Sequence, residues 1–580
     1  MIIDGKQEIF QPDRKRLSKS LGSYQKSVDS ALAEMRKNRT MTRIWTHDHT
    51  VWKPESTDIT NRLGWLTTAE MMLENLPHLE AFVEEVRTAG YTHTLLLGMG
   101  GSSLAPEVFS KTFGGGETNG RSPRQLDFAV LDSTDPGAVK AHAERLDLTR
   151  TLFIVSTKSG GTVETLSFFK YFYNLVAEVV GPAEAGECFV AITDPGSHLE
   201  ELAAEYDFRR TFLNDPNIGG RYSALSYFGL VPAALIGMDV ETLLRRALSM
   251  AGNSKNSDSS LESDNCGLQL GTVMGELAKA GRDKVTFAIS QEIGGFGDWV
   301  EQLIAESTGK ERTGILPVVH EPLGPPEVYG GDRLFVSMKL SSDNTNDAAM
   351  KALEDGGHPA IRIHLDDLYD LGGQFFLWEM ATAVAGSLMG INPFDQPDVE
   401  ASKVLARDTV AEYSKKGAWP PCESAPLTTE ALNTFLSQSR PGDYVALQAY
   451  VPPTVGTDGA LREFRRALRD KYKLATTVGF GPRFLHSTGQ LHKGDGGHGL
   501  FIQFTADDQC DVPIPDKAGS PESSMTFGLL KAAQALGDRQ ALLDRGRRVI
   551  TFHLDHDVEG RLKQLTGALG ECANNVILRR

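Results

Sequence analysis

The sequence lacks the features of secreted, membrane and nucleic-acid-binding proteins. It has five cysteines in 580 residues, and they lack the paired spacing of a metal site, which predicts free thiols in a reducing compartment. No basic region leads into an apolar core at the amino terminus, and no hydrophobic run is long enough to span a membrane. The net charge is −17 without a long basic run, which argues against nucleic acid as the main partner. We therefore expect a cytoplasmic protein that binds neither nucleic acid nor a membrane.

What is present is ordinary for a globular protein. The chain is 40% hydrophobic and 23% charged, as in typical soluble domains. A length of 580 residues is too great for one core and predicts two to four domains. Because the net charge is negative, an anionic substrate would have to be held in a locally positive pocket.

The most informative stretch is Ser156–Thr165, with the sequence Ser-Thr-Lys-Ser-Gly-Gly-Thr-Val-Glu-Thr. It follows the apolar run Thr151–Val155, which predicts a buried parallel strand. Apolar residues then recur at helical spacing, so the stretch is a turn from a strand into a helix. Adjacent glycines, short hydroxyl side chains and the helix dipole together predict a cradle for an anion, most plausibly a phosphate. The alternative is an ordinary capped turn, because serine and threonine also cap helices.

A second glycine- and serine-rich loop, Gly98–Leu104, follows the apolar strand Tyr91–Leu97. With Asp132 at the end of the next strand, this loop could be interpreted as a dinucleotide fingerprint, which would predict a nicotinamide enzyme. Ser103 in place of the third glycine and the hydroxyl-rich second loop count against that interpretation. Two converging phosphate loops suit a sugar phosphate better.

The alternation of strands and helices predicts an α/β fold. Parallel, doubly wound sheets covered by helices are expected, with both glycine-rich loops at the carboxyl ends of strands, where ligands bind in such sheets. We divide the chain into a mostly helical segment, two α/β domains and an extra α/β region at the carboxyl terminus; the ranges are 1–90, 91–238, 239–405 and 406–580.

Three further stretches offer charged side chains for chemistry. Arg221 follows two glycines and could meet a phosphate or a developing enediolate with its forked donors. Glu306 ends a predicted helix beside a Ser-Thr-Gly-Lys turn and could act as a base. Lys403 follows a stretch stiffened by prolines and could reach an anionic oxygen. Each could equally be an ordinary solvated residue if it stood alone.

Histidines near the carboxyl terminus offer proton transfer near neutral pH. His486 precedes a Ser-Thr-Gly-Gln turn that could hold an imidazole at the edge of a site, and His358 is its competitor. His486, His492 and His498 could also suggest a metal, but no carboxylate or cysteine completes a recognised spacing. We therefore expect no metal.

In combination these stretches resemble the phosphoglucose isomerase family of sugar-isomerase-domain proteins. Four segments carry the resemblance in the family's order: Gly98–Ser102, Thr157–Glu164, Gly219–Ser223, and Gln302–Lys310 with Asn392–Lys403. They cover most of residues 90–405. The opening segment and the carboxyl-terminal region resemble the isomerase half of bifunctional transaldolase–isomerase proteins, but the chain is too short at its front to hold a transaldolase barrel.

The resemblance implies two flavodoxin-like sugar-isomerase domains and a role in glycolysis and gluconeogenesis. The implied reaction interconverts glucose 6-phosphate and fructose 6-phosphate through ring opening and an enediolate, with no cofactor. Arg221 matches the residue that stabilises the enediolate, Glu306 the base, and Lys403 a lysine that contacts the substrate. The remaining matches bind the substrate or its phosphate, and they are Gly101, Ser102, Thr157, Lys158, Ser159, Thr162, Glu164 and Gln396.

One departure concerns the histidine that opens the sugar ring. In the family it lies between the base and the lysine, whereas here the matching turn, Leu485–Gln490, follows Lys403. Family dimers take this histidine from the neighbouring subunit, so a carboxyl-terminal region that supplies His486 within one chain would permit a monomer as well as a homodimer. Two alternatives stay open: a non-catalytic sensor of sugar phosphates, and an isomerase that also accepts mannose 6-phosphate.

Overall fold

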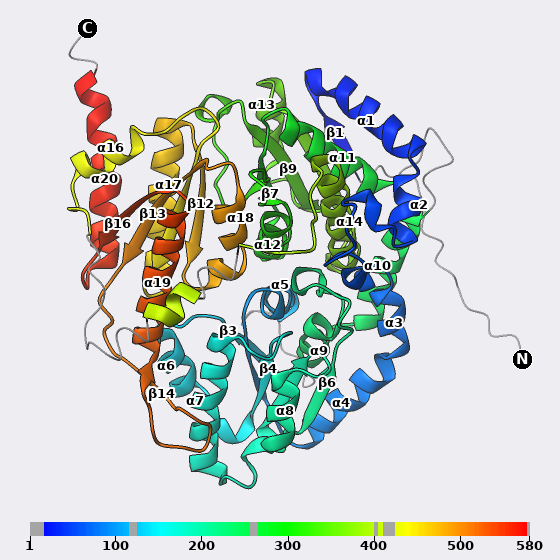
Figure 1. Cartoon of the computed structure of the whole chain (residues 1–580), viewed down its shortest axis with the longest axis vertical. Coiled ribbons are helices and arrows are strands. Elements are labelled where there is room, and N and C mark those ends of the chain that lie inside the picture. The colour runs from blue at the N-terminus through cyan, green and yellow to red at the C-terminus, as the bar shows by residue number, and fades with distance from the viewer. Residues whose placement is uncertain (1–16, 115–124, 256–264, 399–403, 410–423, 577–580) are drawn as a thin grey trace, which may run out of the picture.

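The computed structural model describes residues 17–114, 125–255, 265–398, 404–409 and 424–576 (Figure 1). Three sheets, parallel except for one edge strand of the second, lie in three parts of the molecule, the first in the lower part of Figure 1 and the other two in the upper part. A two-stranded pair, β14 (Pro513–Ile514) and β15 (Met525–Thr526), is separate from them.

The first sheet has the strand order β3-β2-β4-β5-β6, with every pair parallel. Its first strand therefore lies second from the edge, as in flavodoxin-like folds. The strands are β2 (His93–Gly98), β3 (Asp127–Leu131), β4 (Thr151–Ser156), β5 (Phe189–Thr193) and β6 (Arg210–Leu213). The helices are α5 (Leu104–Phe113), α6 (Pro136–Arg145), α7 (Val163–Val180), α8 (His198–Glu205) and α9 (Tyr227–Ile236).

The second sheet repeats this order, β10-β9-β7-β8, and adds β1 antiparallel at its edge. Its strands are β1 (Leu17–Ser20), β7 (Lys284–Ile289), β8 (Leu316–Val318), β9 (Arg333–Leu340) and β10 (Ala360–Leu365). Its helices are α10 (Val240–Lys255), α11 (Cys266–Lys279), α12 (Phe296–Thr308), α13 (Asp347–Asp355) and α14 (Leu371–Met389).

The third sheet has the order β12-β11-β13-β16 and is also wholly parallel. Its strands are β11 (Tyr444–Tyr450), β12 (Ala475–Phe480), β13 (Gly499–Thr505) and β16 (Arg548–His553). Its helices are α16 (Thr429–Leu436), α17 (Val455–Tyr472), α18 (Gly489–Gly494), α19 (Phe527–Asp544) and α20 (Val558–Val576). The predicted α/β class with doubly wound parallel sheets is confirmed, and the carboxyl-terminal region is itself a doubly wound unit.

The opening segment is held to the body by tryptophans. Its helices are α1 (Gln25–Lys37), α2 (Thr40–Trp45), α3 (Thr68–Glu74) and α4 (Leu76–Thr88). Trp52 donates to the carbonyl of Ala383 over 2.7 Å, and Trp65 packs 5.4 Å from Tyr222 between ring centres. These contacts show that aromatic side chains anchor the opening segment to the body.

The cysteines and the apolar helices can be compared with what the sequence predicts. The described cysteine side chains, Cys188, Cys266 and Cys510, are thiols that take part in no disulfide bond. Within the described ranges, no helix combines the length and the apolar character needed to cross a membrane.

Candidate active site

The first glycine-rich loop is pressed against the arginine loop. An added Cβ at Gly101 would lie 2.1 Å from the carbonyl oxygen of Gly220, so only glycine allows this approach. Gly100 has a φ of +54°, which favours glycine for the same turn. The neighbouring Ser102 is buried. The close approach brings the loop after β2 and the loop that carries Arg221 to one place.

The second loop, after β4, lines a cavity of about 280 Å³. Ser159 and Thr162 lie in its wall, and the hydroxyl oxygens of Thr157 and Thr162 are 2.8 Å apart. Helix α7 begins at Val163, so its first N–H groups lie at this wall, where an anion is stabilised. Lys158 points elsewhere: its ammonium pairs with Asp194 and donates to a backbone carbonyl.

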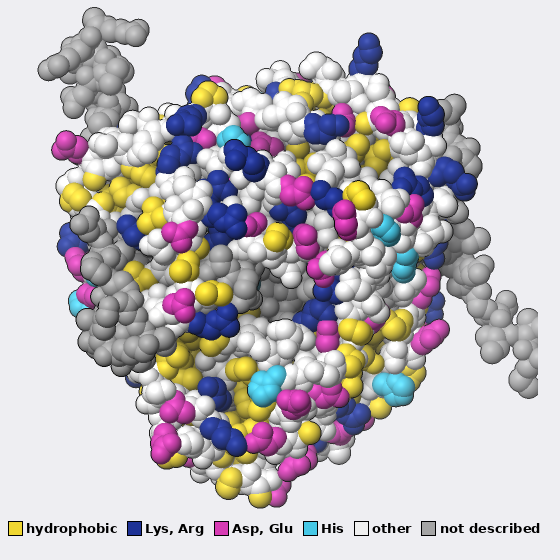
Figure 2. All heavy atoms as spheres, viewed as in Figure 1, with side chains coloured by type: hydrophobic (Ala, Val, Ile, Leu, Met, Phe, Trp, Pro, Cys, Tyr) yellow, Lys and Arg dark blue, Asp and Glu magenta, His cyan; other side chains and the backbone are white. Residues whose placement is uncertain are grey.

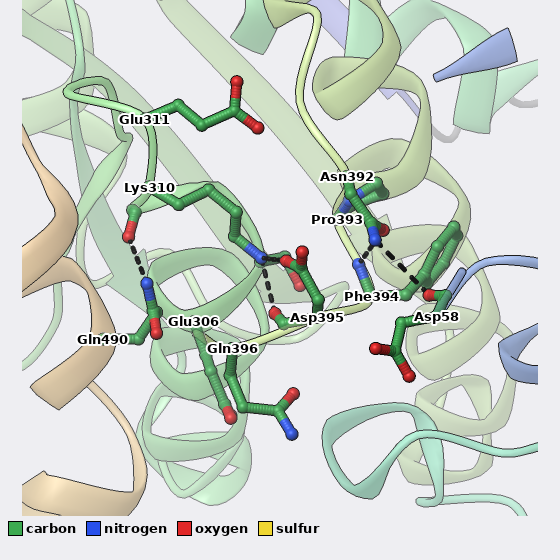
Figure 3. Close-up of polar contacts among 12 residues, drawn as sticks. Asp58, Glu306, Lys310, Glu311, Asn392, Pro393, Phe394, Asp395, Gln396 and Gln490 are labelled. Atoms are coloured by element: carbon green, nitrogen blue, oxygen red, sulfur yellow. Dashed lines mark hydrogen bonds and ion pairs between the residues drawn. The ribbon is translucent and has the colours of Figure 1, made fainter. Parts of the chain in front are cut away.

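Arg221 and Glu306 form the centre of a buried polar group. Arg221 Nη1 lies 3.2 Å from Glu306 Oε1 and donates to Gln396 Oε1 over 3.0 Å. Its other nitrogens donate to the Ser307 hydroxyl and to two carbonyls of the loop that carries Gln396. The guanidinium is therefore fixed in position, with its charge beside the carboxylate. Figure 3 shows the ends of Glu306 and Gln396 below that loop.

His486 reaches the site from the third sheet within the same chain. It lies in a short helix after β12, and its Nε2 is 2.9 Å from Glu164 Oε1. Glu164 is buried and also accepts a hydrogen bond of 2.7 Å from Gln534. A carboxylate that holds one ring nitrogen fixes the orientation of an imidazole. Among the residues that the structure describes, none binds the other nitrogen, Nδ1.

Gln302 joins the histidine to the proposed base. Its amide donates to Glu306 Oε2 over 3.1 Å and to the backbone carbonyl of His486 over 2.7 Å. Gln302 lies four residues before Glu306 on α12, so both side chains are on one helix face. That spacing is visible in the sequence, so the contact between Gln302 and Glu306 could have been predicted from it.

The turn that carries His486 is anchored by a partly buried arginine. Arg483 pairs with Glu107 and lies 2.9 Å from Asp132 and 3.8 Å from Asp298. Asp132 also accepts a hydrogen bond from Ser103. In a dinucleotide fingerprint, Asp132 would bind a ribose. Here its carboxylate instead binds Ser103 and Arg483 of the same chain.

The other histidines lie elsewhere. His358 packs against Phe335 and its Nε2 is 3.2 Å from the carbonyl oxygen of Pro326. His492 is buried among aromatic rings, and neither of its nitrogens has a partner among the described residues. His498 lies at the surface, 3.7 Å from Asp443. His486, His492 and His498 therefore do not converge on one point.

Lys310 fixes the loop between the second and third units (Figure 3). Its ammonium donates to the backbone carbonyl and to Oδ1 of Asp395, over 2.5 and 2.6 Å. Burial, together with the nearby Arg221, lowers the pKa of Lys310 to about 8. Gln490, in the turn after His486, donates to Gly309 O over 2.9 Å. Lys403 lies outside the described residues.

Lys493 is a cation in the cavity wall that the sequence analysis missed. It lines the same cavity as Glu164 and His486, and its ammonium lies 2.6 Å from Asp538 Oδ1. Both side chains are buried. Like Gln534, Lys493 lies far along the chain from the first sheet, and no local pattern marks either residue. On the face drawn in Figure 2, the surface is hollowed where the lower and upper parts of the molecule meet, with Lys and Arg side chains at the rim.

The chain is similar to proteins of known activity. The family model described as phosphoglucose isomerase matches residues 49–321. The glucose-6-phosphate isomerase of Rubrobacter xylanophilus is 29% identical over 389 residues, which cover 59% of this chain and 87% of that protein. The probable glucose-6-phosphate isomerase of Methanococcus maripaludis is 28% identical over 352 residues, 55% of this chain and 78% of that protein.

Solved structures show the same fold. A hypothetical protein of Thermus thermophilus superposes with a TM-score of 0.58 at 23% identity, over 68% of this chain and all (100%) of that one. A glucose-6-phosphate isomerase of Chlamydia trachomatis superposes with a TM-score of 0.55 at 18% identity, over 73% of this chain and 92% of that one. The family match, the curated relatives and the order of the sequence motifs agree in what the chain is similar to, the phosphoglucose isomerases.

Proposed function

We propose that this chain interconverts glucose 6-phosphate and fructose 6-phosphate, a step of glycolysis and gluconeogenesis. The observation that carries the proposal is that the Glu306 carboxylate lies 3.2 Å from the fixed guanidinium of Arg221. Gln302 connects Glu306 to the backbone of His486, which supplies an imidazole. A base beside a cation suits the removal of a proton next to a carbonyl, because the charge that develops is stabilised where it forms.

The phosphate of the substrate docks on the two loops of the first sheet. The hydroxyls of Ser102, Thr157, Ser159 and Thr162 donate to its oxygens, and the N-terminus of α7 adds backbone donors. Gly101 lets the first loop come close. Lys158 lies behind the cavity wall, paired with Asp194, and acts on the phosphate only through its charge at a distance.

Ring opening is assigned to His486. Glu164 holds its Nε2. The other ring nitrogen takes the proton of the anomeric hydroxyl, which becomes the carbonyl, and a proton is given to the ring oxygen as its bond to the anomeric carbon breaks. Lys403 assists by stabilising the oxygen. Because Glu164 and His486 belong to one chain, this arrangement does not need a second subunit to supply the histidine.

Isomerisation then needs one base. Glu306 removes the proton from C2 of the open aldose and returns it to C1, while Arg221 stabilises the negative enediolate between the two steps. General base catalysis of this kind contributes about 10²–10⁴-fold to the rate, and preorganised charge stabilisation adds a few kcal/mol. Gln396, bound to Arg221, contacts the substrate beside them.

Proton NMR in heavy water tests the proposal. Purified protein with fructose 6-phosphate, without added metal or nucleotide, should form glucose 6-phosphate that carries deuterium at C2. Glu306→Gln is the control, and it should bind the sugar phosphate without converting it. Clear binding with no conversion by the unmodified protein would instead support a sensor of sugar phosphates.

A further inference from the structure

The third sheet has an unassigned cavity at the position where doubly wound sheets bind ligands. In the order β12-β11-β13-β16, the side of the sheet to which successive strands are added changes between β11 and β13. Ligands of open α/β sheets bind outside the carboxyl ends of the strands at such a point. A cavity of about 330 Å³ is lined there by Tyr450, Thr505 and His553, the last residues of β11, β13 and β16. Helix α19 supplies the facing wall.

This cavity is distinct from the candidate active site. Both cavities share α19, but they use different sides of it: Leu530 and Gln534 line the active-site cavity, and Lys531 and Ala535 line the second one. None of the residues assigned above to the isomerase reaction lies in the wall of the second cavity.

A buried hydroxyl in the wall lacks a partner. Tyr450 is 1% exposed, and its Oη has no hydrogen bond among the described residues. A buried hydroxyl without a partner is costly, and most such groups are satisfied. Burial, followed by the charges of Asp538 and Glu164, raises the pKa of Tyr450 well above its usual value. The phenol therefore stays protonated and can both donate and accept.

The charges of the cavity exclude an anionic ligand. The one buried cation in its wall, Lys531, already pairs with Asp135 at 2.8 Å and with Asp508. His553 Nε2 lies 3.2 Å from Asp507 Oδ1 at the same edge. Carboxylates thus outnumber the free cationic groups in this part of the described structure, and the hydroxyl-rich glycine loops of the first sheet have no counterpart in this wall.

The remaining groups suit hydroxyls and C–H faces. Thr505 and Thr551 add hydroxyls to that of Tyr450. Thr505 Oγ1 lies 3.0 Å from His553 Nδ1, and Thr551 donates to Gln503 over 3.2 Å. Each of the two threonine hydroxyls therefore keeps a lone pair that can accept from a ligand hydroxyl. Ala532, Ala535 and Leu536 give an apolar side to the cavity. We propose that this cavity is a second binding site, for a small uncharged polyhydroxylated molecule such as an unphosphorylated sugar or cyclitol. The proposal does not rest on the proposed isomerase function.

Saturation-transfer NMR with D-glucose and myo-inositol as probes tests this site in the full-length protein. Transfer to at least one probe is expected, and it should persist when fructose 6-phosphate or inorganic phosphate is added in excess. Tyr450→Phe removes only the unpartnered oxygen and keeps the ring, so the fold should be retained while affinity falls about tenfold, the value of one hydrogen bond. Ala532→Leu, at a partly exposed position, should fill the cavity and abolish transfer.

Glu306→Gln is the matched control and should leave transfer to the probe unchanged. Three results would overturn the proposal: no transfer to either probe, transfer that is insensitive to both Tyr450→Phe and Ala532→Leu, or loss of transfer on adding the sugar phosphate or inorganic phosphate. The last result would place the probe in the candidate active site or show an anion site. Conversion of fructose 6-phosphate is measured separately, so failure of the isomerase proposal would be recognised independently.

Discussion

The first and third sheets are built alike and contribute different chemistry. Each is wholly parallel, and in each the first strand lies second from one edge. The strand tips of the first sheet carry glycines and neutral hydroxyls, as in Ser102 and Thr162. The third unit instead contributes a titratable imidazole, His486, a buried cation, Lys493, and the amide of Gln534. In the proposed function, the same scaffold thus holds the phosphate in one place and proton-transfer groups in another.

Specific buried contacts fix the third unit against the first. Lys531 lies 2.8 Å from Asp135, and both side chains are buried. Thr134 donates to Gln534 over 3.0 Å, and Gln534 in turn binds Glu164. Because these contacts set the relative position of the two sheets, His486 is held by a rigid interface and not by a single loop. A site assembled between rigid elements keeps its geometry more precisely than one built on loops.

The largest effect is expected at Glu306, which belongs to neither of the compared sheets. Glu306→Gln keeps the size of the side chain and one of its two accepting oxygens and removes the base, so turnover should fall by about 10³–10⁴-fold. Binding of fructose 6-phosphate should be retained, as measured by calorimetry. Near-normal turnover in this variant would remove Glu306 as the base.

The next largest effect is expected on stability, from the buried pair of Lys493 and Asp538 in the third unit. Lys493→Met leaves Asp538 buried without its partner at 2.6 Å, and breaking a buried ion pair in this way costs about 3–5 kcal/mol. The double variant Lys493→Met, Asp538→Leu should recover much of that loss, because no charge is then left unpaired. Thermal unfolding at pH 7 measures both.

Lys351→Met is the control for this prediction. Lys351 lies 2.5 Å from Asp355 in an exposed pair on α13, and exposed pairs contribute about 0–1 kcal/mol. If Lys493→Met and Lys351→Met lowered the free energy of unfolding equally, the buried pair would stabilise the third unit no more than an exposed pair does.

Part of this organisation could be predicted from the sequence. The turn at Ser156–Thr165 and the apolar strand before it follow from local residue types, and β4 and α7 lie where that pattern predicts them. Helix α12, Phe296–Thr308, carries Glu306 near its end, as the sequence predicts. Long periodic or wholly apolar segments can be predicted, because the residues that a helix or strand buries recur at a regular spacing along the sequence.

Two short edge strands of the second sheet were not predicted. β1, Leu17–Ser20, has one large apolar residue and joins the second sheet through backbone hydrogen bonds. β8 has three residues with Pro317 at its centre, which is tolerated because it lies at an edge. The order of strand, charged helix, strand and glycine–glutamine turn occurs in the sequence both around Leu334–Gln374 and around Tyr444–Gln490, and it suggests an internal repeat. The strand order differs from that repeat, because β11 and β12 occupy the places of β7 and β8.

Long-range partners were the least predictable part of the site. Gln534 is 370 residues from Glu164 along the chain, and no pattern near either residue indicates the contact. Local sequence specifies strand tips and turns, whereas the pairing of one tip with another depends on how three sheets pack.

A smaller effect is expected from the pH dependence of Lys310. Burial lowers its pKa from 10.5 to about 8, so between these pH values the unfolded chain binds a proton that the folded chain has released. The free energy of unfolding should therefore rise with pH from about 8 to 10.5, by about 3 kcal/mol from this group. Lys310→Met should remove this rise. Urea unfolding at several pH values measures the difference, and parallel curves for the two proteins would contradict it.

The smallest effect is expected at His486, and it tests whether the third sheet supplies ring opening. His486→Ala should lower turnover of fructose 6-phosphate by about 10²-fold, the lower end of general acid–base catalysis. It should leave turnover of 5-deoxyfructose 6-phosphate unchanged, because that ketose cannot close its ring and needs no opening. Surface His498→Ala, 3.7 Å from Asp443, should change neither rate. Equal losses on both sugars would assign His486 to substrate positioning. Unimpaired turnover of the cyclic sugar would mean that the third sheet takes no part in ring opening, and the comparison between the two sheets would then concern architecture alone.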